Sequence, residues 1–245
     1  ADPITGGKQV VCETWRNLIS VGSKPIAITN CLNFGSPEKY EIMGQFVETI
    51  DGISQACKYL DFPVVSGNVS FYNETQSKAI PPTPTIGGVG LIKNLNYMMT
   101  TNLKEIGSYI LVVGKTLGHL WQSEFFREVL EIKDGPPPEI NLFNEKNNGM
   151  LIQTLISKKL VNAVHDISSG GILVALSEMC ISGKIGAKIK IPRNNISPHE
   201  YLFGEDQSRY LIEIKEKNKK EVSNLLEKNS IYYEVIGKTQ KDYLD

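Results

Sequence analysis

The sequence predicts a mixed α/β protein made of two α/β domains. Its 245 residues exceed the roughly 100 to 200 residues of one typical domain. Segments with a helical apolar period alternate with short apolar runs that suit buried strands, and this pattern loosens between residues 94 and 108. We therefore expect a first domain over residues 1–104 and a second over residues 105–245.

The first half alternates helix and strand. Residues 9–21 and 40–60 carry apolar side chains at spacings of three and four, which predicts two helices. The apolar runs 26–32 and 62–65 predict buried strands, and the Gly-rich run 86–92 predicts a third. Because strand, helix and strand follow one another, the ends of the first two strands should meet at one edge of the sheet, where open α/β sheets bind ligands.

The second half repeats this alternation, and two linking segments also have a predicted structure. Helices are predicted over residues 117–130, 150–160, 172–181 and 215–228. Strands are predicted over residues 109–113, 161–164, 187–191, 210–214 and 232–236. We expect residues 75–79 to form a hairpin or a mobile loop, and the Pro-rich residues 81–85 to run extended along an edge.

Composition excludes several classes of protein. The 26 basic and 27 acidic residues give a net charge of −1, so no overall field favours nucleic acid or an anionic membrane. No apolar run approaches the roughly 20 residues of a membrane span. The four cysteines have no Cys-x-x-Cys spacing, which indicates reduced residues of a cytoplasmic protein and argues against zinc or disulfides. The first residues, ADPITGGK, lack an initiator Met, so we expect a piece of a longer polypeptide.

Residues 63–74 (PVVSGNVSFYNE) are the strongest candidate for a site, because an apolar run gives way there to small polar residues. Gly67 allows a turn or the close approach of a ligand to the backbone. Amide, hydroxyl and carboxylate oxygens follow at Asn68, Ser70, Asn73 and Glu74. This set is typical of a phosphate or metal-nucleotide site, although an ordinary turn has the same composition.

Two more polar clusters occur in the second half. In the first, His165-Asp166 precedes Gly170-Gly171 at a predicted helix start, where backbone N–H groups can hold an anion or Ser168 or Ser169 can cap the helix. In the second, Glu205 and Asp206 suit a metal and Gln207 and Arg209 a phosphate, with a solvated turn as the alternative. The sequence holds three histidines and none of the common catalytic motifs, so we assign no catalytic residue.

These motifs together resemble the second half of the phosphoribosylformylglycinamidine synthase family, over nearly the whole chain and in order. The matching stretches are DP with GGK (residues 2–8), WRN (15–17), KPIAIT (24–29), LNFG (32–35), MGQF (43–46), PVVSGNVS (63–70), PTP (82–84), HD with GG (165–171) and FGEDQ (203–207). The family belongs to the aminoimidazole-ribonucleotide-synthetase-like superfamily of ATP users.

The resemblance implies a fold and a reaction. The fold would be an N-terminal half-barrel α/β domain followed by a C-terminal α/β domain. The reaction would be the conversion of formylglycinamide ribonucleotide to its amidine in purine biosynthesis, with ATP, Mg²⁺ and ammonia from glutamine. The partners would be the N-terminal half of the polypeptide, a glutaminase subunit and a small helper subunit.

The resemblance also implies residue roles. By position, Gly67 is similar to an ATP contact, Asn68 to a magnesium ligand and Ser70 to a contact with the ribonucleotide substrate. Asn30 stands where the family has an aspartate that contacts ATP, so this chain lacks that charge. The family's catalytic histidine belongs to the other half, and we therefore expect this chain to be inactive alone.

Two other functions remain open. One is a non-catalytic scaffold that docks partner subunits. The other is a different ATP-dependent enzyme of the superfamily, such as a selenophosphate synthetase, although Asn30 and Asn68 replace the carboxylates that such enzymes need. Because half of the barrel would be missing, we also expect the chain to form a homodimer.

Overall fold

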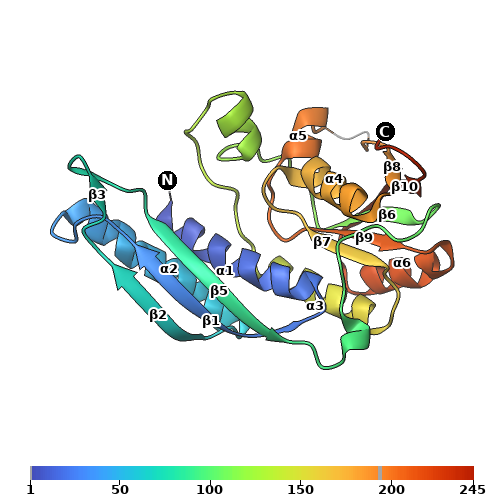
Figure 1. Cartoon of the computed structure of the whole chain (residues 1–245), viewed down its shortest axis with the longest axis horizontal. Helices are drawn as coiled ribbons and strands as arrows, with labels where there is room; N and C mark the ends of the chain where they lie inside the picture. Colours follow the sequence, from blue (N-terminus) through green and yellow to red (C-terminus); the bar gives the residue numbers. More distant parts are fainter. Residues whose placement is uncertain (1, 193–194) are drawn as a thin grey trace. The chain divides into compact units, whose positions relative to one another are not determined.

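A computed structural model describes residues 2–192 and 195–245 and confirms the mixed α/β class (Figure 1). Contacts divide the chain into two compact units. The first contains the residues up to Leu18 together with Lys24–Leu91, and the second contains Ile19–Ser23 and Ile92–Asp245. Residues 92–104 are thus grouped with the second unit by their contacts. The domain limits 1–104 and 105–245 remain sequence-based predictions.

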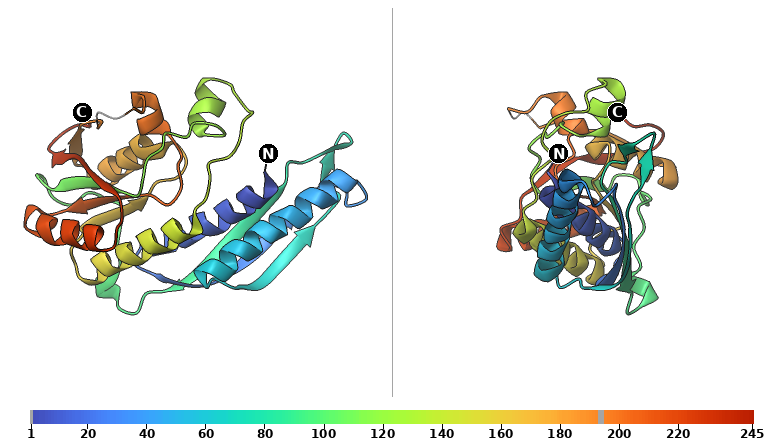
Figure 2. Two further views of the ribbon diagram at one scale, coloured as in Figure 1. Left: turned by 180° about the vertical axis from the view of Figure 1, so that it is seen from behind. Right: turned by 90° about the vertical axis from the view of Figure 1, so that its left-hand side faces the viewer.

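The first unit is a small sheet with two helices on one face (Figures 1 and 2). Its elements are α1 (Pro3–Ser20, which continues into the second unit), β1 (Lys24–Asn33), α2 (Tyr40–Leu60), β2 (Val64–Ser70), β3 (Glu74–Thr75), β4 (Lys78–Ala79) and β5 (Thr83–Leu91). The strand order is β2-β1-β5, with β1 and β2 parallel and β5 antiparallel. The strand–helix–strand prediction is therefore confirmed, and β3 and β4 form the predicted hairpin.

Helix α1 begins earlier than its apolar pattern predicted, since the Gly6-Gly7 pair lies inside the helix. A Cβ on Gly7 would overlap the carbonyl oxygen of Thr49, and a Cβ on Gly52 would overlap that of Ile4. The two helices therefore touch backbone to backbone. These glycines serve a helix contact and not the loop that their composition suggested.

Strand β2 also differs from its prediction. We predicted a strand at residues 62–65 followed by a polar exit, but the strand is Val64–Ser70, so the polar run lies within it. The physical reason is position: β2 is at the end of the strand order, and most of its residues are exposed. An exposed edge strand needs no apolar alternation, and so its pattern resembles a loop.

The second unit is built on a five-stranded sheet with the order β7-β9-β6-β10-β8. Its strands are β6 (Tyr109–Val113), β7 (Ala163–Asp166), β8 (Gly186–Ile189), β9 (Tyr210–Ile214) and β10 (Tyr233–Gln240). Its helices are α3 (Leu142–Ser157), α4 (Gly171–Gly183), α5 (Pro198–Phe203) and α6 (Lys219–Lys228), with short 3₁₀ turns at Leu95–Tyr97 and Glu216–Asn218. A core of apolar side chains, including Ile110, Leu176 and Leu211, joins the sheet to α4 and α5.

The helix predicted over residues 117–130 is wrong. Only one π-helical turn, Phe125–Val129, forms there. Gly118 and Gln122 have positive φ angles, which interrupt a right-handed helix. The amphipathic pattern of this segment is satisfied by aromatic contacts instead, such as the stacked rings of Phe125 and Phe203, whose centroids lie 4.7 Å apart.

None of the helices in the described ranges combines the length and the apolar character that a membrane crossing requires.

Candidate functional site

The predicted site residues lie on two neighbouring parallel strands. In the register of β1 and β2, Asn30 is opposite Gly67, Cys31 is opposite Asn68, and Asn33 is opposite Ser70. The structure thus brings all four predicted residues, Asn30, Gly67, Asn68 and Ser70, into one short stretch of sheet. They lie within the strands, however, and not in loops beyond them.

The four residues divide between the two faces of the sheet, which corrects the expectation that their side chains converge. Alternate residues of a strand point to opposite faces. Asn30 shares a face with the buried Ile28 and Leu32, and a Cβ on Gly67 would overlap its amide oxygen. This face carries α1, since a Cβ on Gly88, opposite Ile28, would meet side chains of that helix.

Asn68 and Ser70 lie on the other face, which the helices leave open. The Asn68 Nδ2 is 3.8 Å from the Sγ of Cys31, its register partner. Other polar residues of this face were not predicted from the sequence. The register places Cys31 and Thr85 in a row with Asn68, Asn33 and Thr83 in a row with Ser70, and Thr29 in a row with Ser66. The period-two alternation of TNCLN and TPT was the signal that could have found them.

A compact group of hydrogen bonds links the segments that follow the carboxyl ends of β1 and β2. The Asn73 amide donates to the carbonyl oxygens of Phe34 at 3.0 Å and Ser70 at 2.9 Å. Glu74 accepts from Lys39 Nζ at 2.6 Å, which lowers the pKa of the Glu74 carboxyl. Asn73 and Glu74 therefore hold two loops together, whereas we predicted that they line a ligand site.

The open face offers neutral ligands only. Within the described ranges, no group of three or more His, Cys, Asp or Glu side chains is arranged to hold a metal ion. Asn68 is exposed and can supply one amide oxygen. Mg²⁺ is usually held by one or two carboxylates together with several waters and substrate phosphates, and a neutral amide is a weaker ligand than a carboxylate. The donor set therefore fits Mg²⁺ only as the companion of a bound triphosphate.

The Glu205 carboxylate lies at Gly170, where the sequence left open whether the helix start holds an anion or is capped by a serine. Its Oε1 accepts from the backbone N–H groups of Gly170 and Glu124, both at 2.8 Å. Burial raises the pKa of the Glu205 carboxyl, although these bonds oppose that shift. An internal carboxylate thus occupies the N-terminus of α4, where the sequence suggested an anion site or a serine cap.

Asp206 and Arg209 are also engaged inside the protein. Asp206 accepts from the backbone N–H groups of Leu117, Gly118 and His119 at 2.9, 2.8 and 3.2 Å. Arg209, which is fully buried, donates to the carbonyl oxygens of Asp206 and Gly204. This cluster is neither the solvated turn nor the exposed ligand site that the sequence left open.

His165 forms a small ion-pair cluster. Its Nε2 is 2.9 Å from Glu178 Oε2, and its Nδ1 is 3.5 Å from Asp166 Oδ1. Burial lowers the pKa of His165, but the two carboxylates outweigh burial and the net pKa is raised. The ring therefore joins β7 to α4, as a structural histidine does.

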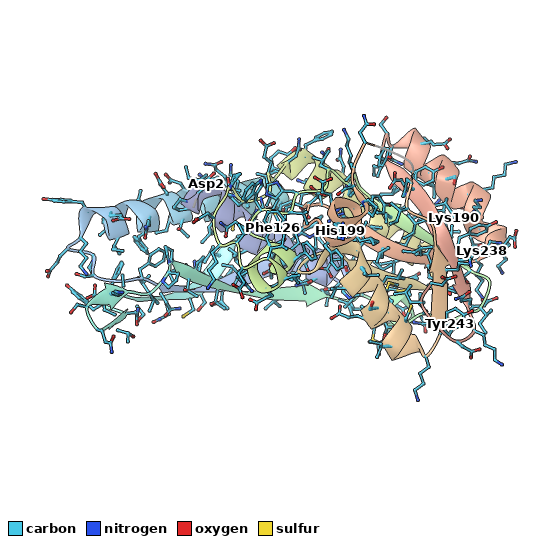
Figure 3. The ribbon with its side chains drawn as sticks, turned by 90° about the horizontal axis from the view of Figure 1, so that it is seen from above. Asp2, Phe126, Lys190, His199, Lys238 and Tyr243 are labelled. Atoms are coloured by element: carbon cyan, nitrogen blue, oxygen red, sulfur yellow. The ribbon has the colours of Figure 1, made fainter. Side chains whose placement is uncertain are left out.

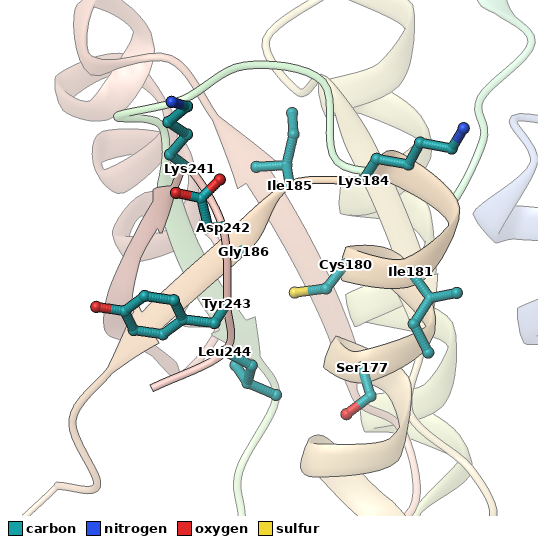
Figure 4. A pocket seen from close by; sticks show the side chains of 10 residues that line it. All are labelled: Ser177, Cys180, Ile181, Lys184, Ile185, Gly186, Lys241, Asp242, Tyr243 and Leu244. Carbon is teal, nitrogen blue, oxygen red and sulfur yellow. The ribbon is translucent and has the colours of Figure 1, made fainter.

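Two of the cavities in the second unit border the helices α3 and α4. The larger, about 860 Å³, lies among Trp121, Phe126, Asn144 and Gln207. The other, about 490 Å³, lies between α4 and the last residues of the chain and includes Cys180 and Lys184 (Figure 4).

Family profiles match both units. Residues 1–92 match the N-terminal domain of AIR synthase related protein, and residues 105–244 match its C-terminal domain. The chain therefore belongs to the AIR synthase related family. The superfamily expected from the sequence is thereby confirmed.

Within this family, the chain is similar to relatives that share one name. The chain is 59% identical over 244 residues to the phosphoribosylformylglycinamidine synthase subunit PurL of Pelagibacter ubique, covering 100% of this chain and 33% of the relative. It is 48% identical to the subunit of the same name from Rhodopseudomonas palustris, covering 98% and 32%. The resemblance found in the sequence is confirmed, and the chain spans about a third of the length of these relatives.

Solved structures support the fold. Thermotoga maritima PurL complexed with ATP superposes with a TM-score of 0.76 at 19% identity, covering 100% of this chain and 39% of that one. The complex of the same protein with FGAR gives 0.78 at 20% identity, covering 100% and 41%. The hydrogenase maturation protein HypE of Escherichia coli gives 0.77 at 15% identity, covering 97% and 75%.

Proposed function

We propose that this chain is part of a phosphoribosylformylglycinamidine synthase and supplies nucleotide contacts to it. In this reaction ATP phosphorylates the amide oxygen of formylglycinamide ribonucleotide and leaves as ADP. Ammonia derived from glutamine then attacks the iminophosphate carbon and displaces phosphate, which gives the amidine. The 59% identity to a relative of that name is the observation that carries this proposal.

The nucleotide contacts are proposed at the edge strand β2. A ligand that lies across an edge can reach both faces of a sheet and the backbone between them, so the division of the four residues between faces is compatible with one ligand. In this arrangement Gly67 offers backbone beside ATP, Asn68 an amide oxygen to Mg²⁺, and Ser70 a hydroxyl to the ribonucleotide.

Asn30 is the weakest of these contacts. Its amide oxygen lies against Gly67 on the face that α1 covers. An aspartate here would place a charge in the same position, so the neutral amide is better suited to this packing. We propose that Asn30 acts on ATP through its contact with Gly67.

Calorimetric titration of the chain with ATP, with and without Mg²⁺, tests the proposal. We expect heat that depends on Mg²⁺, and a loss of that dependence in Asn68→Ala. Asn96→Ala, on a 3₁₀ turn of the second unit, is the matched control. Binding with the same Mg²⁺ dependence in Asn68→Ala would remove Asn68 from the site.

Catalysis requires further polypeptide in this proposal. We expect no synthase activity from the chain alone, and activity once the N-terminal half, the glutaminase subunit and the helper subunit are added. A homodimer in the absence of that half is part of the same proposal, and light scattering at high concentration measures it. A monomer under those conditions would contradict the dimer and leave the nucleotide contacts untouched.

A scaffold is the second candidate, and one observation favours it. Glu205 and Asp206, which belong to the FGEDQ stretch that resembles the family, are bound to backbone N–H groups of their own unit. A pure scaffold gives no Mg²⁺-dependent heat with ATP but still restores activity when added to the other components. The calorimetric result therefore separates the two functions.

A further inference from the structure

A groove with a cationic rim lies over strands β6, β8 and β10 of the second unit's sheet. It has a volume of about 340 Å³ and is lined by Tyr109, Lys188, Lys190, Val235, Ile236, Gly237 and Lys238. We call it the lysine groove. It is separate from the four residues on β1 and β2, and the proposed function does not use it.

The register of three strands sets the rim. Lys238 of β10 is opposite Tyr109 of β6 on one side and Lys188 of β8 on the other. These three side chains therefore form a row across the sheet. Lys190, just beyond β8, adds a third lysine to the lining that contains Lys188 and Lys238 (Figure 3).

The floor of the groove is apolar. The pairing of β10 with β6 shifts register between Val235 and Gly237, and Val235 is 41% exposed. Gly237 has no side chain, and a Cβ there would overlap the carbonyl oxygen of Lys188. Gly237 therefore allows β8 to approach closely and adds no space of its own, so the apolar surface of the groove is the exposed part of Val235 beside Tyr109.

Positive charge exceeds negative charge around this groove. Tyr109 has the Nζ atoms of Lys219 and Lys238 at 4.1 and 4.2 Å from its ring centroid. The carboxylates that face the rim are Asp245, 2.6 Å from Lys188, and Glu216, 3.8 Å from Lys238. In the described part of the chain, Lys190 has no ion-pair partner.

The last residues of the chain lie beside the lysine groove, along β8. Residues 243–245 run alongside β8, where Ala187 donates to the Tyr243 carbonyl at 2.9 Å and Ile189 to that of Asp245 at 2.8 Å (Figure 4). The Asp245 side chain then reaches Lys188. An extended segment that carries a carboxylate is thus already accommodated beside the rim.

We propose that the lysine groove docks an extended acidic segment of a partner protein, with one apolar side chain seated between Tyr109 and Val235. Lysines act here as separate point charges, and the rim has no arginine fork of the kind that grips phosphate in a bidentate way.

Fluorescence anisotropy with a labelled peptide Glu-Glu-Trp-Glu-Glu tests this proposal on the 245-residue chain. The variant Lys188→Glu/Lys190→Glu/Lys238→Glu should bind the peptide at least about tenfold more weakly, since like charges then face each other. Lys78→Glu/Lys93→Glu/Lys133→Glu, an equal charge change at exposed lysines elsewhere, should bind it as the unaltered chain does. Lys190→Glu alone serves if the triple variant does not fold.

Further binding measurements distinguish the kind of ligand. Replacing Trp by Gly in the peptide, or Val235 by Ser in the protein, should weaken binding, because the apolar insertion is lost. Equal weakening by the groove and control variants, or no weakening by either, would overturn the proposal. Tighter binding of polyphosphate or oligothymidylate of matched charge would instead assign the groove to a phosphate polymer.

Discussion

Two glycine-containing polar runs, SGNVS on β2 and GEDQS before β9, are alike in sequence but opposite in the structure. On β2 most of the residues are exposed, and Asn68 makes only a weak contact with Cys31. In the second run Asp206 and Ser208 are buried, and Asp206 accepts three backbone N–H groups. What separates the exposed polar run from the structural cluster is therefore whether nearby backbone already supplies the partners.

The largest expected effect lies in the second run. Asp206→Ala would leave the N–H groups of Leu117, Gly118 and His119 without their acceptor and remove a carboxylate from the buried Arg209. Breaking a buried charged network typically costs about 3 to 5 kcal/mol. We expect a loss of unfolding free energy of that order in urea denaturation.

A matched variant sharpens this prediction. Asp242→Ala removes a carboxylate from the rim of the 490 Å³ cavity and should change the unfolding free energy by less than about 0.5 kcal/mol. A loss of less than about 1 kcal/mol in Asp206→Ala would mean that solvent replaces Asp206 as the acceptor, and the contrast between the two runs would fail.

The second effect concerns the contact between β1 and β2. Gly67→Ala should destabilise the chain by about 1 to 3 kcal/mol, because the new Cβ overlaps the Asn30 amide. In the double variant Asn30→Ala/Gly67→Ala the overlap is gone, so the two changes should be less than additive. Strict additivity in a double-mutant cycle would contradict the packing of Asn30 against Gly67.

The sequence predicted most elements, and two of its errors share a cause. Strands β6 and β9 lie where their apolar runs predicted them, because both are central strands that apolar side chains cover. The start of α1 and the extent of β2 were missed, because Gly7 serves a tertiary contact and β2 is an exposed edge. Apolar periodicity reports burial, and it does not detect elements whose residues are selected for other reasons.

The sequence predicted which site residues lie near one another, but it did not predict which face of the sheet each side chain takes. Parallel pairing of β1 and β2 followed from the chain order, which brought Asn30 and Gly67 together. Which face each side chain takes depends on the register, and the register includes a shift between Ile28 and Thr29 that no pattern in the sequence indicates.

The third effect is smaller and depends on pH. The pKa of His165 is raised in the folded chain, against its burial, by Asp166 and Glu178. A raised pKa stabilises the fold below the unfolded value of about 6.5, and this contribution is lost as pH rises through the folded value. The advantage of the unaltered chain over His165→Gln should therefore be larger at about pH 5.5 than at about pH 8.5.

Glu178→Gln tests the cause of that shift. It removes one of the two carboxylates that raise the pKa of His165. The unfolding free energy of Glu178→Gln should therefore change less with pH than that of the unaltered chain, as expected for His165→Gln. If the stability of the unaltered chain relative to the variant increased as the pH rises, that result would contradict the ion-pair assignment.

The smallest expected effect completes the contrast with Asp206. Asn68→Ala should change the unfolding free energy by less than about 0.5 kcal/mol, since Asn68 is exposed and its contact with Cys31 is weak. Asn73→Ala, five residues later, should cost about 1 to 2 kcal/mol, because its amide joins two loops at Phe34 and Ser70. Urea denaturation of both variants measures the difference. A loss in Asn68→Ala as large as that in Asn73→Ala would give Asn68 a structural role, and its exposure would then no longer support a place in the nucleotide site.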